Sequence, residues 1–398
     1  MMEDTQIVGR IAREEAQGHG LRLTAIIDTT SVSGPGRQLA AMMDRLTALG
    51  VDGRVVTFHR AGRSRSPYLD YLERAGVQCT VLEERGRFDV RLILRLRRLL
   101  DDWAPDVVQT HGYKPTVLAH VLRRSGARWA WVAFFHGATS ENATVRFYHF
   151  LDTRLLGRAD RVVVMSREQA ARFARLGSKV SIIYNAALDL QDCGTDMRRN
   201  ASAVAGTTPC VGVVGRLSPE KGVDVFLHAC RELTDRGRTF RALVVGDGPE
   251  RTRLEELCTT LRLGHQVQFL GAVSAMPTLY AALQLLVIPS RSEGLPNVLL
   301  EALSADVPVV ATRVGAIPDV LEGTGAGALV TPESPRALAD AIETSILTPC
   351  DQLARRARRT VVERFSVQRR AMEHLRLYTE LCPSRSGGQA SAPVVSVH

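Results

Sequence analysis

Aromatic residues, paired cysteines and long hydrophobic runs are all scarce in this chain of 398 residues. No segment reaches the roughly 20 apolar residues that a membrane-spanning helix needs, and the acidic segment 1–20 lacks the apolar core of a secretory signal. The seven cysteines are scattered without metal-ligand or redox spacing, which favours reduced thiols in a cytoplasmic protein. Aromatic residues amount to 5% and do not alternate with the arginines, which argues against nucleic-acid binding.

Lysine is scarcer still, since Lys114, Lys179 and Lys221 stand against 48 arginines. A lysine inside a motif is therefore less easily explained as a default surface residue. The net charge of +9 lies entirely in residues 1–188, which carry 28 basic and 19 acidic residues, whereas the remainder carries 23 of each. A basic half beside a neutral half indicates an anionic surface as a partner of the first half.

Strand-like and helix-like segments alternate along most of the chain. This rhythm predicts an α/β fold of two tandem doubly wound Rossmann-like domains that face a cleft. The first domain is expected over 21–188 and the second over 210–365, joined by a polar linker over 189–209. A lead-in over 1–20, a terminal helix over 366–382 that can cross back to the first domain, and a disordered tail over 383–398 complete the prediction.

Two loops of the second domain carry residues suited to binding phosphate. In sheets of this kind, ligands bind beyond the carboxyl ends of the strands. The loop Gly215–Gly222 follows a predicted strand and holds Arg216 and Lys221 near a helix N-terminus, which suits a diphosphate without a metal. Gly246 and Asp247 follow the next strand, close to where a nucleotide would lie. The alternatives are a solvated basic turn and a plain glycine turn.

The stretch Pro289–Ala311 reads as a polar turn, a helix and a strand, preceded by the apolar run Leu283–Ile288. It carries Glu293 in the turn and Glu301 on the helix. A largely helical offset of eight residues would place both acids on one face about 12 Å apart, so both can face one cleft. The alternative is one capping and one solvated glutamate.

The segments GRLSPEKG, GDGPE and PSRSEGLPNVLLEA, in this order and in tandem α/β domains, resemble the retaining glycosyltransferases of family 4 (glycosyl transferases group 1), which have the GT-B fold. The resemblance implies a nucleotide-diphosphate sugar as donor and no required cofactor or metal. It implies that Arg216 and Lys221 bind the diphosphate, that Glu293 lies by the donor sugar, and that Glu301 binds the ribose hydroxyls. Backbone amides near the sugar and phosphate would come from Gly294, Leu295 and Asn297. Many members have Phe-Gly where this chain has Leu295-Pro296, which leaves the sugar open.

Three loops of the first half extend the resemblance. Gly34, Gly36 and Arg37 resemble the family's glycine-rich loop over the phosphates and the acceptor, although a simple turn is the alternative. His111 and Lys114 follow the fourth predicted strand and are expected on the acceptor side. His136 follows the fifth and resembles a family histidine that contacts the donor sugar, which would add it to Glu293, Arg216 and Lys221 as a catalytic residue. A structural role is the alternative for each histidine.

The resemblance thus implies transfer of a hexose or hexosamine, with retention, to a glycan or lipid-linked acceptor in cell-surface or exopolysaccharide assembly. By the frequency of donors in the family, a UDP-sugar is expected first and GDP-mannose second. No residue is an obvious covalent nucleophile at the right place, which favours front-face attack. The alternatives are a nucleotide-sugar epimerase, a phosphorylase, or a non-catalytic nucleotide-sugar-binding protein. Arginines among the leucines of 85–100 indicate a basic amphipathic helix on an anionic membrane, with the protein peripheral on the inner face of the cell membrane, or else a solvated face over a core stripe.

Overall fold

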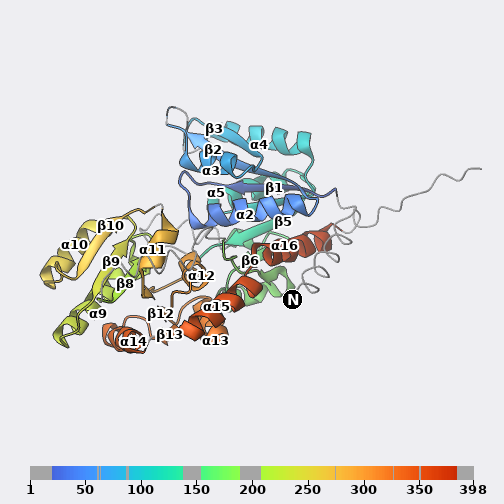
Figure 1. Ribbon diagram of the computed structural model, residues 1–398. Coiled ribbons are helices and arrows are strands. Elements are labelled where there is room, and N and C mark those ends of the chain that lie inside the picture. The colour runs from blue at the N-terminus through green and yellow to red at the C-terminus, as the bar shows by residue number, and fades with distance from the viewer. Residues whose placement is uncertain are drawn as a thin grey trace, which may run out of the picture. The chain divides into compact units, whose positions relative to one another are not determined.

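The computed structural model describes residues 20–60, 62, 64–86, 89–137, 154–188, 208–273, 275–325, 327–348 and 351–382 (Figure 1). The predicted tail, the predicted lead-in except its last residue, and the predicted linker except its last two residues lie outside the described residues. The chain divides into two compact units. The first contains Met1–Phe135, Leu151–Val163 and Gln368–His398, and the second contains His136–Phe150 and Val164–Val367. The predicted domain limits at 188 and 210 stay predictions.

Parallel strands form the first sheet, in the order β3-β2-β1-β4-β5-β6-β7. The strands β1 and β4 are buried almost throughout, as expected where helices cover both faces of a parallel sheet. The strands are β1 (Arg22–Ile27), β2 (Asp52–Arg60), β3 (Cys79–Glu84), β4 (Val107–His111), β5 (Ala130–Phe135), β6 (Arg161–Val164) and β7 (Val180–Ile182). The helices between them are α2 (Gly34–Ala48), α3 (Pro67–Arg74), α4 (Val90–Trp103), α5 (Tyr113–Arg124), α7 (Arg167–Arg172) and η1 (Ala174–Lys179).

The last helix, α16 (Val367–Leu381), packs within the first unit. The hydroxyl of Tyr378 donates to Oε1 of Gln109 on β4. The ring of His374 stacks on Phe134 of β5, with centroids 5.4 Å apart. Both α16 side chains are fully buried, so the end of the described chain is part of the core of the first unit.

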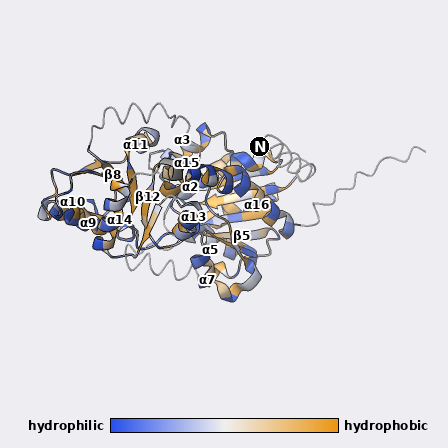
Figure 2. Ribbon diagram, turned by 60° about the horizontal axis from the view of Figure 1, so that its bottom comes forward, coloured by the Kyte–Doolittle hydropathy of each residue, from blue (hydrophilic) through white to orange (hydrophobic). Residues whose placement is uncertain are grey.

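The second sheet is also parallel and runs in the order β10-β9-β8-β11-β12-β13. Its strands are β8 (Cys210–Val214), β9 (Arg241–Val245), β10 (Val267–Gly271), β11 (Leu285–Ile288), β12 (Val309–Thr312) and β13 (Gly327–Val330). Its helices are η2 (Pro219–Lys221), α9 (Val223–Asp235), α10 (Arg251–Thr260), α11 (Met276–Ala282), α12 (Asn297–Ser304), α13 (Ile317–Thr324), α14 (Pro335–Leu347) and α15 (Asp351–Arg364). In Figure 2 the strands are mainly hydrophobic, whereas the helices alternate between hydrophobic and hydrophilic residues. The predicted fold class, α/β with two parallel sheets, is confirmed.

Two local expectations are corrected by the structure. Helix α2 begins at Gly34, where a glycine-rich loop is expected from the sequence, because Ser33 caps it by accepting from the backbone N–H of Gly36 at 3.2 Å and Pro35 suits the first turn. Gly34, Gly36 and Arg37 therefore belong to a helical turn and not to a loop. Pro296 precedes α12 as its N-cap, so only the second half of the interval from Glu293 to Glu301 is helical. The expected largely helical spacing of the two acids is corrected accordingly.

Candidate functional site

The three predicted motif loops leave adjacent strands of the second sheet, since β9, β8 and β11 are neighbours. Each loop begins at the carboxyl end of its strand, where an open parallel sheet binds ligands. A small pocket there is lined by the ends of β8 and β11 together with Gly215, Arg216, Lys221, Ser290 and Glu293. Residues that are far apart in the chain, from Val213 to Val298, thus meet at one edge of the sheet.

An ion pair joins the first of these loops to the third. Nζ of Lys221 lies 2.8 and 3.0 Å from the two carboxylate oxygens of Glu293, and the hydroxyl of Ser290 donates to Oε1 at 2.6 Å. The Glu293 side chain is only 8% exposed and that of Lys221 is 28% exposed. The cation predicted to bind phosphate and the acid predicted to bind sugar are therefore direct partners in this structure. Arg216, the other predicted cation, is exposed on the same loop.

Two glycines allow the loops to touch. Gly222 has φ +63°, and a Cβ there would lie 2.1 Å from the carbonyl oxygen of Pro289. Gly246 has φ +128°, and a Cβ there would lie 1.8 Å from the carbonyl oxygen of Gly215. An L side chain fits neither the backbone conformation nor the space, so glycine is needed at both positions.

Asp247 serves its own loop in this structure. Its Oδ1 accepts from the backbone N–H of Gly248 at 2.8 Å, and its carbonyl accepts from the backbone N–H of Leu217 at 3.0 Å. The side chain is exposed. These bonds hold the loop after β9 against the loop after β8, which is the role expected of a glycine turn; a contact with a nucleotide stays a prediction.

Glu301 is buried at 2% exposure on α12. The hydroxyl of Tyr280, on α11, donates to its Oε2 at 2.8 Å and is itself fully buried. A buried hydrogen-bonded carboxylate is not the solvated glutamate of the alternative interpretation. Sequence reasoning missed Tyr280, since nothing in its neighbourhood marks it as the partner of an acid 21 residues away.

The turn after Glu293 is held by its neighbours within the second unit. Nδ2 of Asn185 donates to the carbonyl oxygen of Leu295 at 2.9 Å and to Oδ1 of Asn297 at 3.2 Å. A Cβ added to Gly294 would lie 3.4 Å from the carbonyl oxygen of His136. The structure thus brings the His136 backbone beside the Glu293 turn, and a role of His136 at the donor sugar stays a prediction.

A second neighbour of this turn was missed by the sequence. A Cβ added to Gly294 would lie 3.2 Å from Nε2 of Gln169, whose Oε1 accepts from the backbone N–H of Met165 at 2.9 Å. Gln169 is buried on α7, three residues after its N-cap Ser166. A glutamine in a short helical segment carries no sequence signal that it will pack against a turn 125 residues further along the chain.

In the first unit, the predicted acceptor residues are embedded in local contacts. The hydroxyl of Tyr68 donates to the carbonyl oxygen of Gly36 at 3.2 Å. His111 is 4% exposed, its ring stacks on Phe134 with centroids 4.4 Å apart, and its Nε2 lies 2.5 Å from Nε2 of Gln109. These contacts favour a structural role for His111.

Lys114 lies at the start of α5 within a cluster of charges at the carboxyl ends of β1 and β3. Its Nζ is 2.6 Å from Oε2 of Glu84 and 3.5 Å from Oδ2 of Asp28, and it lies 4.0 Å from the ring centroid of Phe58. Burial raises the pKa of Asp28, while the Lys114 charge opposes this rise. Lys114 is therefore a paired cation beside the point between β1 and β4 where the strand order reverses.

Two kinds of feature are absent from the described part of the chain. Within the described ranges, no group of three or more histidine, cysteine or acidic side chains is arranged to hold a metal ion. Among the helices of those ranges, none combines the length and the apolar character needed to cross a bilayer.

Two protein-family models match the chain. Residues 33–186 match "Glycosyl transferase 4-like domain", and residues 208–347 match "Glycosyl transferases group 1". Together the matches cover most of both units, including every motif loop described above.

Curated relatives match with moderate identity. An "Alpha-D-kanosaminyltransferase" of Streptomyces kanamyceticus is 32% identical over 191 residues, which are 46% of this chain and 50% of that protein. A "Putative colanic acid biosynthesis glycosyltransferase WcaL" of Escherichia coli (strain K12) is 29% identical over 279 residues, 66% of this chain and 68% of that protein. The chain spans about half the length of several of the curated relatives it matches.

Solved structures share the fold over nearly the whole chain. A crystal structure of Anabaena Alr3699/HepE in complex with UDP and glucose has a TM-score of 0.77 at 21% identity, and it covers 90% of this chain and 99% of that one. A sucrose-phosphate synthase (tll1590) from Thermosynechococcus elongatus has a TM-score of 0.76 at 20% identity, with 92% and 100% covered. At these identities the likeness shows the fold alone.

Proposed function

The chain belongs to the glycosyl transferases group 1, with the GT-B fold, and we propose that it transfers a hexose or hexosamine from a nucleotide-diphosphate sugar to a hydroxyl of a glycan or lipid-linked acceptor. The observation that carries this proposal is the Lys221–Glu293 ion pair at the carboxyl edge of the second sheet. It puts a cation for a phosphate and a carboxylate for sugar hydroxyls in one pocket. Biosynthesis of cell-surface or exopolysaccharide is the proposed context.

The reaction needs stabilisation of the leaving diphosphate. As the bond from the anomeric carbon to the phosphate oxygen breaks, negative charge grows on the phosphate, and cations already in place lower the barrier. We assign this role to Lys221 and Arg216, with help from the N-terminus of α9, which begins directly after Gly222. Neither group requires a metal, so activity in the presence of a chelator is expected.

Retention of the anomeric configuration is proposed to follow front-face attack. Glu293 is engaged by Lys221 and Ser290, which suits it to hold sugar hydroxyls and not to act as a covalent nucleophile. The acceptor hydroxyl then attacks from the side of the departing diphosphate, whose oxygen takes the proton. His136 is proposed to contact the donor sugar, because its backbone lies beside Gly294.

The donor nucleotide is proposed as UDP, with GDP-mannose second. HepE, which shares the fold, was crystallised with UDP and glucose. The proposed ribose ligand is Glu301, whose carboxylate is fixed by Tyr280. The deciding experiment measures nucleotide release from a panel of UDP- and GDP-sugars, with and without acceptor sugars. Release with one donor, stimulated by acceptor and lost in Lys221→Met, supports the transferase. Binding without any turnover would leave only a nucleotide-sugar-binding protein.

Helix α4 is proposed to touch an anionic membrane surface, which would place the protein at the inner face of the cell membrane. Its leucine stripe, Leu92, Leu96 and Leu100, is buried in the unit, so that stripe is core. Two other apolar side chains remain outside, Val90 at 72% and Leu94 at 58% exposure, beside exposed arginines. Sedimentation with vesicles of anionic and of zwitterionic lipid tests this. We expect the protein to bind anionic vesicles and the Leu94→Ser variant to lose this binding. If equal amounts of the unmodified protein stay in the supernatant with anionic and with zwitterionic vesicles, the proposal is contradicted.

A further inference from the structure

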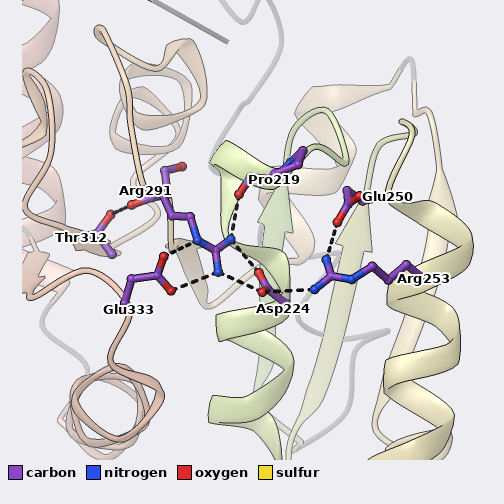
Figure 3. A network of polar contacts seen from close by, with 8 residues as sticks. Pro219, Asp224, Glu250, Arg253, Arg291, Thr312 and Glu333 are labelled. Carbon is purple, nitrogen blue, oxygen red and sulfur yellow. Dashed lines mark hydrogen bonds and ion pairs between the residues drawn. The ribbon is translucent and has the colours of Figure 1, made fainter. Parts of the chain in front are cut away.

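Arg291 uses all of its hydrogen-bonding capacity inside the second unit (Figure 3). A guanidinium has five N–H donors. Nη1 donates to the carbonyl oxygen of Pro219 at 2.7 Å and to Oδ1 of Asp224 at 2.8 Å, and Nη2 donates to Oδ2 of Asp224 at 2.9 Å. Nη2 also donates to Oε2 of Glu333 at 3.0 Å, and Nε donates to Oε1 of Glu333. With five donors engaged, Arg291 has no N–H left for a substrate.

The position of Arg291 links the two halves of the proposed donor site. It lies two residues before Glu293, in the turn after β11. Its backbone N–H donates to the carbonyl oxygen of Glu220 at 2.8 Å, and its side chain holds that of Pro219. These two carbonyls belong to η2, the turn that ends in Lys221. One residue therefore ties the Lys221 turn to the Glu293 turn.

Asp224 makes this arrangement electrostatically significant. It lies in the first turn of α9, the helix whose N-terminus follows the loop that is proposed to bind the diphosphate. A carboxylate there takes up the favourable end of the helix dipole and repels any other anion nearby. Burial raises the pKa of Asp224, but the hydrogen bonds and charge of Arg291 outweigh it and hold that pKa below its ordinary value. The acid is thus a carboxylate whose charge is offset by a bidentate arginine.

The other groups around Asp224 are weaker partners. Nη2 of Arg253 lies 3.9 Å from Oδ2, but that side chain is 59% exposed and also pairs with Glu250. Glu333 is 58% exposed, so its pair with Arg291 contributes little by itself. Glu333 has φ +61°, a backbone conformation that a non-glycine residue adopts at some cost and keeps only where its surroundings hold it.

We propose that Arg291 masks the charge of Asp224 and positions the Lys221 and Glu293 turns, so that the N-terminus of α9 can accept the diphosphate of the donor without Arg291 touching it. This rests on the proposed function. Arg291 is a positioning residue, and its effect has two separable parts. The masking part depends on charge and on salt, whereas the positioning part depends on the number of hydrogen bonds.

The test measures binding of UDP, GDP and uridine by calorimetry at 20 and 300 mM salt to four variants: Arg291→Met, Asp224→Asn, the double variant, and Glu333→Gln as the matched control. Arg291→Met is expected to weaken binding of the diphosphate about tenfold at low salt and less at high salt, since screening shortens the reach of Asp224. Uridine binding should not change. The double variant should return to within about threefold of Asp224→Asn, and Glu333→Gln should stay within about twofold of the unmodified chain.

Arg291→Lys separates positioning from masking and serves if Arg291→Met does not fold. It keeps the charge but offers three donors from a point, so it cannot span both acids and the carbonyl. Diphosphate affinity within about threefold of the unmodified chain, with kcat reduced about tenfold, is expected. A lysine variant with unchanged kcat would overturn the positioning role.

A double variant no better than Arg291→Met would overturn the masking role. If the unmodified chain binds neither UDP nor GDP, the proposed function fails and this inference falls with it. If it binds one of them and Arg291→Met binds it equally well, only this inference fails.

Discussion

Replacing Lys221 by methionine should separate the stability of the second unit from its activity. In the unmodified chain, Nζ holds both oxygens of Glu293, whose side chain is 8% exposed. Methionine keeps the apolar stem and removes the charge. Glu293 is then a nearly buried carboxylate that keeps the Ser290 hydroxyl as a donor but has lost its cation.

The magnitude follows from the burial of the two groups. Removing one partner of a fully buried ion pair costs about 3–5 kcal/mol, because the other charge is left unpaired. The Lys221 side chain is 28% exposed, so water offsets part of the loss, and we expect about 2–3 kcal/mol. Adding Glu293→Gln removes the unpaired charge and should recover most of that stability. Catalysis should not recover, because in the proposed mechanism the loss of one preorganised cation at the leaving group lowers kcat by about 10²–10³.

The assay combines urea unfolding with initial rates of nucleotide release. All three tryptophans, Trp103, Trp129 and Trp131, lie in the first unit, so their fluorescence reports that unit alone. Far-UV circular dichroism follows both units, and the phase absent from fluorescence reports the second. The reasoning is refuted if the second unit of Lys221→Met unfolds at the same urea concentration as that of the unmodified chain. It is also refuted if the variant that combines Lys221→Met with Glu293→Gln keeps activity within about threefold of the unmodified chain.

Three further changes test single features. Gly246→Ala should cost more than about 2 kcal/mol in the second-unit phase, because its Cβ would lie 1.8 Å from the carbonyl oxygen of Gly215 at φ +128°; an unchanged midpoint would contradict this. Tyr280→Phe should lose about 1.5–3 kcal/mol of charged hydrogen bonding to Glu301 and reduce the preference for UDP over 2′-deoxy-UDP, a ratio that a merely structural tyrosine would leave alone. Burial, with a smaller effect of a neighbouring arginine, holds the pKa of His374 well below its ordinary value, so the unfolded chain binds a proton that the folded one does not. The stability of the first unit should therefore fall as pH drops below about 6.5, by up to about 1.4 kcal/mol per pH unit from this group. His374→Gln should flatten the tryptophan-monitored plot of stability against pH in that range and leave its slope above pH 8 unchanged.

The sequence predicted the motif loops because their signals are local. Strands of a parallel sheet are continuous apolar runs, and the residues after them must lie at the carboxyl edge. Gly222 and Gly246 stand where neighbouring loops come into contact, and this need is visible as glycine in the sequence. The alternation of strands and helices was enough for the fold class, while the start of α2 depended on the cap by Ser33.

The partners of the site residues could not be predicted, because each partnership spans a long stretch of chain. Glu293 lies 72 residues from Lys221, and Arg291 lies 67 residues from Asp224. The local pattern of a sequence does not indicate which distant residues form such pairs. The contacts of His111 are also long-range, since Tyr378 of α16 donates to its neighbour Gln109 from 269 residues away. A histidine before a glycine at a strand end looks the same whether it faces solvent or the core.

The number of cations in the sequence motifs is therefore larger than the net positive charge that a phosphate would encounter at the N-terminus of α9. Lys221 is shared with Glu293, and Arg291 is shared by Asp224 and Glu333, so the formal charges near the α9 N-terminus largely cancel. In the proposed donor site, we expect the diphosphate to compete with Glu293 for Lys221, and Glu293 then to turn toward the sugar hydroxyls. On this reasoning the ion pair prevents tight binding of free inorganic phosphate, which offers no hydroxyls to Glu293, and favours a ligand that carries both a diphosphate and a sugar. Glu293→Gln should accordingly tighten binding of inorganic pyrophosphate several-fold and lower the ratio of sugar-nucleotide affinity to nucleoside-diphosphate affinity. A pyrophosphate affinity and a selectivity ratio that both rise, or both fall, would contradict this reasoning.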